Sequence, residues 1–152
     1  MKKIIFMFAT IVLFLAGIFS ACKETEECKN LYRDNIIGQW KLIGFADTFA
    51  DIIKITEPES EKCYLISFNK DKKVLAVGGC NTLIGNYDIN YITSNINIYD
   101  IDVTIVYCPT YYDEDLYFKS LSNVNFFSIQ EDKLRLYYNN GQNYLLFKIQ
   151  QQ

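Results

Sequence analysis

From residue 35 to the C-terminus, short apolar segments alternate with turns, and this pattern constrains the fold of the chain more than any other feature. The segments are rich in Ile, Val, Tyr and Phe, and polar residues alternate with apolar ones along them. Asn, Asp, Gly and Lys occupy the intervals between the segments. Successive side chains of a β-strand point to opposite faces, so this alternation predicts half-buried strands joined by tight turns.

The apolar stripes predict where the strands lie. Trp40 and Leu42 share one face of the first strand, and Tyr64, Ile66 and Phe68 form the next buried stripe. A polar turn after Phe68 leads into a return strand, which makes a hairpin. The strands are predicted at residues 38–45, 64–68, 74–77, 86–91, 96–101, 125–130, 133–138 and 143–149. The last three are joined by short turns and therefore predict an antiparallel meander.

One segment, residues 109–121, breaks the strand pattern and predicts a short helix. Thr110 can cap its N-terminus, and three acidic residues fall in the first turn, where the helix dipole favours negative charge. Tyr117, Phe118 and Leu121 share one face of this helix. We expect that face to pack on the sheet, which makes the fold class mainly β (α+β).

The N-terminus has the order of a secretory signal. Lys2 and Lys3 precede a nearly unbroken apolar stretch of 16 residues, and small residues follow at Ser20 and Ala21. A membrane anchor is the alternative interpretation, but the apolar stretch is shorter than the roughly 20 residues that span a bilayer. Residues 1–21 are therefore predicted to be a signal peptide.

Residues 19–22 resemble a lipobox, in which a cysteine thiol is alkylated by diacylglycerol before cleavage, with Phe19 in place of the usual Leu. A bulky residue at that position disfavours ordinary signal peptidase. Cys22 is therefore the predicted lipidation site, and residues 22–35 are a predicted acidic tether. The tether resembles an export signal for outer-membrane lipoproteins, and a solvated spacer is the alternative. We expect an outer-membrane lipoprotein, with the periplasmic or cell-surface side left open.

Removing 21 residues from the 152 leaves a mature chain of 131, a size typical of one domain, which we place at residues 36–152. The mature chain has 18 acidic and 13 basic residues, because Lys2 and Lys3 leave with the signal peptide, and its formal charge is −5. Nucleic-acid binding draws on clustered Lys and Arg, so no nucleic-acid partner is expected.

Four cysteines besides the lipidation site enter an oxidising compartment, where paired thiols persist, so two disulfides are possible. These candidates are Cys28, Cys63, Cys80 and Cys108. Four cysteines allow three connectivities, and the residues alone leave all three open. The chain has no Cys-x-x-Cys pair and no histidine, so neither a metal site nor another cofactor is expected.

The absence of histidine removes the commonest general base near neutral pH and the catalytic triads that depend on it. Catalysis would have to rest on carboxylates, either Asp100 and Asp102 or the run Asp113, Glu114 and Asp115. Such clusters are usually solvated loops and helix starts. We therefore expect no catalytic residue and a protein that is not an enzyme.

Several short motifs occur in a characteristic order: residues 38–42, 79–81, 85–87, Thr104 before Cys108, then Glu114, Phe118, Leu121 and residues 134–136. Together they resemble the META domain, the HslJ-like family, over residues 36 to about 149. The sequence departs from the family's pattern in two places. The turn after Phe68 lacks the usual glycine, and residues 105–107, before Cys108, replace a stretch that usually contains small residues or methionine. The resemblance implies a single compact, strongly curved antiparallel sheet, partly closed and barrel-like, with one short helix packed on it.

The resemblance also implies that Cys80 and Cys108 lie close together. A bridge between them would close a loop of about 29 residues, for which the chain-entropy model gives roughly 3 to 4 kcal/mol. Cys28 would then pair with Cys63 by elimination. Four reduced, buried thiols are the alternative.

Two kinds of residue invite a functional interpretation. Asn81 follows a glycine and a cysteine, but turn chemistry explains it, because glycine accepts positive φ and asparagine bonds its own backbone. Most aromatic residues, Trp40 among them, are expected in the core. Adjacent tyrosines on a strand point to opposite faces, so some side chains must be exposed and could bind glycans or proteins. The candidates for such exposed side chains are found among Tyr111, Tyr112, Tyr137 and Tyr138.

The sequence thus predicts a non-enzymatic envelope protein, held on the membrane through Cys22, with stress tolerance or protein interaction as the role of its META-like domain. One alternative is an accessory lipoprotein that binds a glycan or peptide on exposed tyrosines. A small protease inhibitor is another, although no reactive loop stands out.

Overall fold

A computed structural model describes residues 35–49, 53–54, 62–107 and 113–150. The chain divides into two units, Met1–Tyr32 and Arg33–Gln152, and every described residue belongs to the second. The predicted signal peptide, nearly all of the tether, Cys22, Cys28, Cys108 and Tyr111 with Tyr112 lie outside the described residues.

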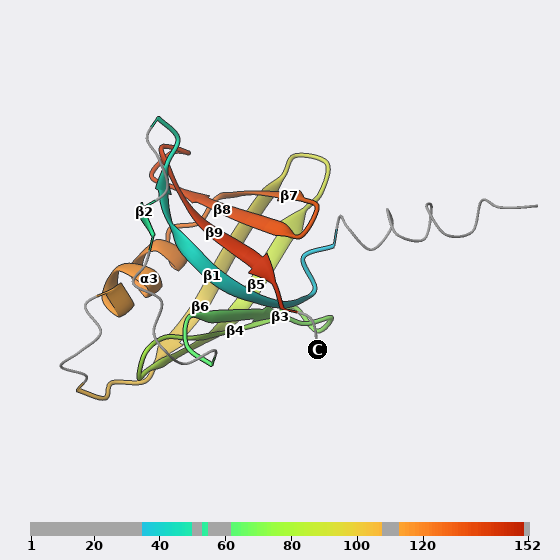
Figure 1. Cartoon of the computed structure of the whole chain (residues 1–152). Coiled ribbons are helices and arrows are strands. Elements are labelled where there is room, and N and C mark those ends of the chain that lie inside the picture. The colour runs from blue at the N-terminus through green and yellow to red at the C-terminus, as the bar shows by residue number, and fades with distance from the viewer. Residues whose placement is uncertain (1–34, 50–52, 55–61, 108–112, 151–152) are drawn as a thin grey trace, which may run out of the picture. The chain divides into compact units, whose positions relative to one another are not determined.

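The described residues form one antiparallel sheet and one helix (Figure 1). The elements are β1 (Gly38–Asp47), β2 (Ile53–Lys54), β3 (Leu65–Phe68), β4 (Lys73–Val77), β5 (Thr82–Asn90), β6 (Asn95–Val103), α3 (Asp113–Leu121), β7 (Phe126–Gln130), β8 (Lys133–Tyr138) and β9 (Asn143–Ile149). The mainly β fold class with a short helix is confirmed. The two-residue strand β2, which carries no alternation of its own, was not predicted.

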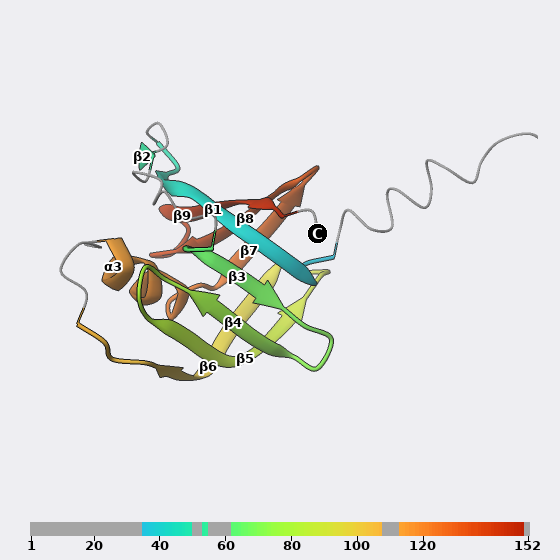
Figure 2. The ribbon, with the colours of Figure 1, turned by 60° about the horizontal axis from the view of Figure 1, so that its bottom comes forward.

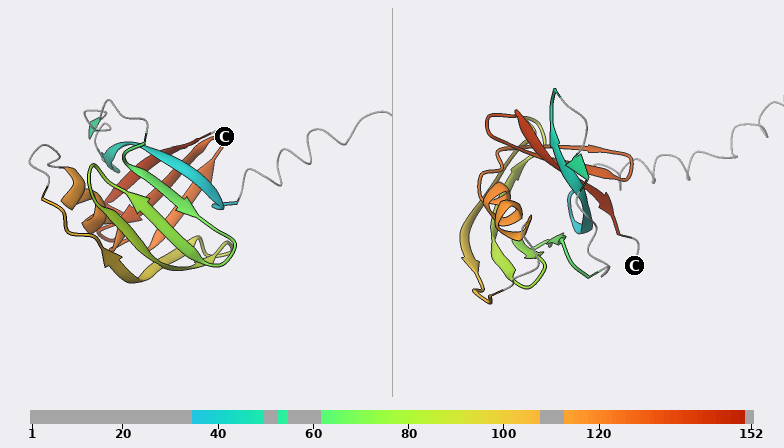
Figure 3. Two further views of the ribbon diagram at one scale, coloured as in Figure 1. Left: turned by 90° about the horizontal axis from the view of Figure 1, so that it is seen from below. Right: turned by 60° about the vertical axis from the view of Figure 1, so that its left-hand side comes forward.

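The sheet closes on itself through β1. Strands β3 to β9 follow one another in order, and β1 pairs with β3 at Gly38–Lys41 and with β9 from Trp40 to Asp47. Strand β2 pairs with β1 at Gly44 and Phe45, beyond the end of β3. The result is the barrel that Figures 2 and 3 show from further sides. The predicted strongly curved, barrel-like sheet is therefore confirmed.

The barrel is weakest between β6 and β7. The two strands are paired only at Asn95 and Phe126, whereas β7 and β8 are paired along five residues each. Helix α3 lies in the connection between β6 and β7 and occupies one end of the barrel (Figure 3). We call this poorly paired junction the seam.

The core confirms the predicted stripes. Trp40 and Leu42 of β1, and Tyr64, Ile66 and Phe68 at β3, are all at most 2% exposed. The indole N–H of Trp40 donates a hydrogen bond of 2.8 Å to the carbonyl of Ile36, so burial of the indole leaves its polar atom with a partner. Large side chains thus fill the inside of the barrel.

Helix α3 packs on the barrel through the face that its spacing predicts. Tyr117 and Leu121 are 0% exposed, and Phe118 is 7% exposed. The Tyr117 hydroxyl donates to the carbonyl of Leu65 at 3.0 Å, and burial raises the pKa of this phenol well above its usual value. The expected cap, Thr110, lies outside the described residues.

Candidate functional site

Glu114, at the second position of α3, is held by the turn between β4 and β5. Its Oε2 accepts hydrogen bonds from the backbone N–H groups of Cys80 at 2.7 Å and Asn81 at 2.9 Å. Its Oε1 accepts one from the Asn81 side-chain amide at 2.6 Å. Burial raises the pKa of Glu114, but the hydrogen bonds from Asn81, Cys80 and the Gly79 backbone together bring that pKa below its usual value. Glu114 is therefore a buried, ionised carboxylate.

Asn81 extends this network to the segment after β6. Its Oδ1 accepts hydrogen bonds from the Thr104 hydroxyl at 3.1 Å and from the backbone N–H of Val106 at 2.7 Å. Its amide also donates to the carbonyl of Val106 at 3.0 Å. Thr104 in turn accepts from the backbone N–H of Thr82 at 3.0 Å. We call the network of Asn81, Thr104 and Glu114 the Glu114 latch.

The latch corrects two expectations from the sequence. Glu114 is 5% exposed, so this member of the acidic run is not solvated. Asn81 bonds distant segments and not merely its own turn. The positive φ expected for Gly79 is not observed, because among the described glycines only Gly38 and Gly141 adopt it. Gly78 is needed because a Cβ there would lie 2.5 Å from Glu114 Oε2.

Among the cysteines, Cys63 has a free thiol, which donates to the carbonyl of Gly79 at 3.9 Å. Cys28, its predicted partner, lies outside the described residues, and so does Cys108, the predicted partner of Cys80. The free thiol of Cys63 speaks against its pairing with Cys28. Cys80 is disulfide-bonded, and its pairing with Cys108 stays a prediction.

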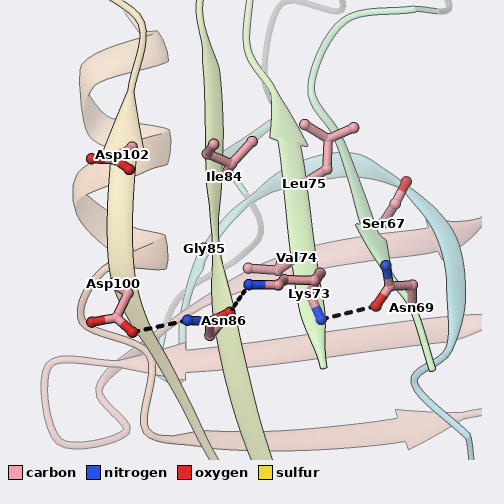
Figure 4. A pocket seen from close by; sticks show the side chains of 10 residues that line it. All are labelled: Ser67, Asn69, Lys73, Val74, Leu75, Ile84, Gly85, Asn86, Asp100 and Asp102. Atoms are coloured by element: carbon pink, nitrogen blue, oxygen red, sulfur yellow. Dashed lines mark hydrogen bonds between the residues drawn. The ribbon is translucent and has the colours of Figure 1, made fainter. Parts of the chain in front are cut away.

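The outer face of β3 to β6 carries a pocket of about 650 Å³, shown in Figure 4. We call it the groove. It is lined by Ser67, Asn69, Lys73, Val74, Leu75, Ile84, Gly85, Asn86, Asp100 and Asp102. Leu75 and Ile84, on neighbouring strands, are 43% and 52% exposed and give the groove an apolar surface. Both carboxylates of the first candidate pair, Asp100 and Asp102, lie here.

A chain of hydrogen bonds crosses the groove at one end (Figure 4). The Lys73 ammonium donates to Asn86 Oδ1 at 2.6 Å, and the Asn86 amide donates to Asp100 Oδ2 at 2.9 Å. The backbone N–H of Lys73 donates to Asn69 Oδ1 at 2.9 Å. These contacts fix the polar side chains while the apolar pair stays open. Sequence reasoning missed Lys73 and Asn86, because nothing local links them to an acid on β6.

A β-bulge positions Asp100. The β5–β6 register shifts between the Ile84–Asp102 pair and the Asn86–Tyr99 pair, so Gly85 faces two residues of β6. Asp100 adopts φ of 51°, a left-handed conformation that Asp tolerates better than most residues. A Cβ on Gly85 would lie 3.0 Å from the Tyr99 carbonyl, which explains the glycine. Gly85 inside a strand was the available signal for this bulge.

The outer face around the bulge is acidic. Asp88, Asp100 and Asp102 are exposed on β5 and β6, and we call these three the acidic face. The pKa of Tyr99 is raised by desolvation first, then by the charge and hydrogen bond of Asp88 and the charge of Asp100. A cation is therefore the favoured neighbour of this surface.

A second outer surface carries aromatic rings. Phe126, Tyr137 and Tyr144 form one cross-strand row over β7, β8 and β9, which we call the aromatic row. The rings of Tyr137 and Tyr144 are 5.4 Å apart, and the Arg135 guanidinium lies 5.9 Å from the Tyr144 ring centre. Tyr138 points inward and is only 8% exposed. Of the tyrosines singled out from sequence, Tyr137 alone is thus placed on an outer surface by the described residues.

Neither a metal-binding cluster nor a membrane-spanning helix occurs in the described ranges. No cluster of three or more His, Cys, Asp or Glu side chains that could hold a metal ion is present there. Within the same part of the chain, no helix is long and apolar enough to cross a membrane.

The fold and the latch define a class: small antiparallel barrels in which a helix at one end is tied down by a buried glutamate. The chain belongs to the META domain family, whose model matches residues 36–151. No curated protein matches it.

Two solved structures share the fold. One is a DUF4847 family protein from Bacteroides vulgatus, with a TM-score of 0.58 and 14% identity, which covers 77% of this chain and 95% of its own. The other is a protein from Burkholderia xenovorans solved by NMR, with a TM-score of 0.58 and 17% identity, which covers 90% of this chain and 98% of its own. At these identities the likeness establishes the fold alone.

Proposed function

We propose that this META-domain protein is a non-enzymatic, lipid-anchored envelope protein that binds a partner protein at the groove. One observation carries the proposal: Leu75 and Ile84 stay exposed side by side on an outer face where Lys73, Asn86 and Asp100 are already joined by hydrogen bonds. Exposed apolar surface rimmed by polar groups is typical of interaction sites. We propose that this binding contributes to envelope stress tolerance.

A role without catalysis fits the chemistry of the acids. Glu114, the buried carboxylate, is fully occupied by hydrogen-bond donors within the protein and cannot take up a proton near neutral pH. Asp100 accepts from Asn86 on an open surface. Neither arrangement provides the pair of groups with opposed protonation states that acid–base catalysis needs.

The anchor is tested separately from the barrel. Cells that express the protein are labelled with radioactive palmitate, beside cells that express Cys22→Ser. We expect label on the wild-type chain alone and recovery of that chain with the outer membrane. Acyl chains contribute about 0.8 kcal/mol per buried methylene, so the unlabelled variant should appear in the soluble fraction. Equal labelling of both chains would refute lipidation at Cys22.

The groove is tested in cells with a photoreactive amino acid at position 84, and at position 133 as the control. Lys133 is exposed at the start of β8, away from the groove. We expect a discrete cross-linked product from position 84 that disappears when Leu75→Glu is added. No product from position 84, or the same product from both positions, would contradict binding at the groove.

Glycan binding is a second candidate, supported by the aromatic row. Neighbouring aromatic rings, here inclined to each other by 48°, form with a guanidinium a surface on which sugar rings can pack. Tyr137→Ala and Tyr144→Ala should abolish retention on a polysaccharide column without a shift in melting temperature. Arg135 also bonds Gln130, so Gln130→Ala serves as the matched control on the same face. Retention that survives both tyrosine substitutions would exclude this candidate.

A further inference from the structure

Strand β6 has an edge that the described sheet leaves uncovered. It pairs with β5 along nearly its whole length, from Asn95 to Val103, but with β7 only at Asn95. From Ile98 onward, the described strands give β6 no partner on the side of the seam. Figure 2 shows β6 as the outermost strand of the β3–β6 part of the barrel.

The register identifies the backbone groups on this edge. The N–H of Thr104 donates to the Thr82 carbonyl on the β5 side, so the groups of Val103 point to the other side. The same alternation, counted across the bulge, turns Ile101 and Ile98 toward the seam. At the far end, the Ile96 N–H donates to the Asn125 carbonyl, which confirms the direction. Ile98, Ile101 and Val103 therefore offer a ladder for one more strand.

Among the described residues, this edge carries neither lysine nor proline, and its protection consists of the bulge at Asp100 and the carboxylates of Asp100 and Asp102, which select against an acidic strand. Lysine, proline or a covering segment normally blocks such an edge. Here Val103 is 40% exposed, and the chain continues through Ile105 and Tyr107, which are 97% and 89% exposed. An unpaired ladder next to exposed apolar side chains is a surface suited to strand addition.

Charge indicates what the added strand carries. Asp100 and Asp102 lie on the outer face of β6, with Asp88 behind them on β5. Among the described residues that line the groove, Lys73 is the one cation, and it already donates to Asn86. Side chains directly opposite one another on paired strands interact, and opposite charges favour the pairing. An incoming strand with Lys or Arg at alternate positions would meet these carboxylates.

We propose that the β6 edge binds an extended segment of a partner protein that has Lys or Arg at alternate positions and β-branched residues between them. The inference rests on the proposed function and deepens it, because it names the chemistry of the partner. The segment adds a strand at the seam, where its basic side chains reach the acidic face and the groove beyond it.

The test uses the mature chain with Cys22→Ser, which removes the lipid and keeps every other residue. The probe is a labelled, end-blocked synthetic peptide that alternates lysine and valine, and a peptide that alternates glutamate and valine is its control. Anisotropy should show saturable binding of the lysine peptide alone. Hydrogen exchange at the amides of Ile98, Ile101 and Val103 should slow in the complex. Binding with no slowing there would overturn the proposal.

Two variants separate the ladder from the charges. Val103→Pro removes an edge N–H that β5 does not use and should abolish peptide binding. Asp100→Asn combined with Asp102→Asn should weaken it about fivefold, and Asn suits the left-handed conformation at position 100. Glu131→Gln, on an exposed turn between β7 and β8, is the control and should change nothing.

The outcomes keep this inference distinct from the proposed function. A cross-link from position 84 together with no peptide binding would refute the β6 edge and leave the groove proposal standing. If neither the cross-link nor peptide binding is observed, both the groove proposal and the β6-edge proposal are refuted. Peptide binding that is unchanged in Val103→Pro, with melting temperature as the fold control, would reduce the interaction to charge attraction alone and refute strand addition.

Discussion

Replacing Glu114 by Gln tests whether the latch holds α3 to the barrel. If the new amide turns its oxygen toward Cys80 and Asn81, the backbone N–H groups stay bonded. Its NH₂ group then faces the Asn81 amide, also a donor, which cannot turn over because its Oδ1 accepts from Val106. The opposite orientation leaves the backbone donors without an acceptor.

Either orientation of the new amide loses charge-assisted bonds worth about 1.5–3 kcal/mol and leaves a buried donor unsatisfied. We expect Glu114→Gln to lower the free energy of unfolding by about 3 kcal/mol. Urea denaturation at pH 7, followed by the fluorescence of Trp40, measures this difference. The control is Asp115→Asn, one residue along the same turn and less buried, which should cost no more than about 0.5 kcal/mol. Equal effects of the two substitutions would refute the latch.

Three further predictions concern the same end of the barrel. Gly78→Ala should cost about 2 kcal/mol or more, because its Cβ would meet Glu114 Oε2 at 2.5 Å, and this cost should fall in a Glu114→Ala background in a double-mutant cycle. The pKa of Glu114 is lower in the folded chain than in the unfolded chain, so the stabilisation that its carboxylate contributes is present above the unfolded pKa and is lost as pH falls through the folded pKa. Urea titrations between about pH 5 and pH 3 should show a steeper loss in wild type than in Glu114→Gln. Removing the predicted bridge with Cys80→Ala and Cys108→Ala should cost roughly 3 kcal/mol, whereas Cys63→Ala, which deletes a free thiol, should cost less.

The strands were predictable because their signal is local. A side chain that points into a barrel is apolar and its neighbour along the strand is polar. This alternation can be recognised within a few residues, and it correctly predicted the buried faces that contain Trp40, Tyr64 and Ile96. Where the signal failed, the cause is a local irregularity. Strand β5 was predicted from residue 86 but begins at Thr82, because the glycine before Asn86 marks a bulge and not the start of a strand.

The latch and the groove were only partly predictable because both depend on distant segments. Residues 78–81, 104–106 and 114 meet only when the barrel has closed, and an acidic run at a helix start gives no sign that one member is buried. The resemblance to the META domain singled out Asn81, Thr104 and Glu114 together, but it did not predict the hydrogen bonds that join them. For the groove, the two acids were found and the apolar pair was not, since exposed Leu75 and Ile84 follow the same alternation as any strand residue.

The latch also explains how an open seam is compatible with a stable barrel. Strands β6 and β7 share one residue pair, so strand pairing alone holds that side weakly. Helix α3 compensates because Tyr117 and Leu121 fill the barrel end while Glu114 ties the helix to β4, β5 and the segment after β6. The barrel therefore does not need β6 and β7 to pair further. That freedom leaves the edge of β6 beside the acidic face and the groove, where an added strand can bind without displacing one of the barrel's own strands.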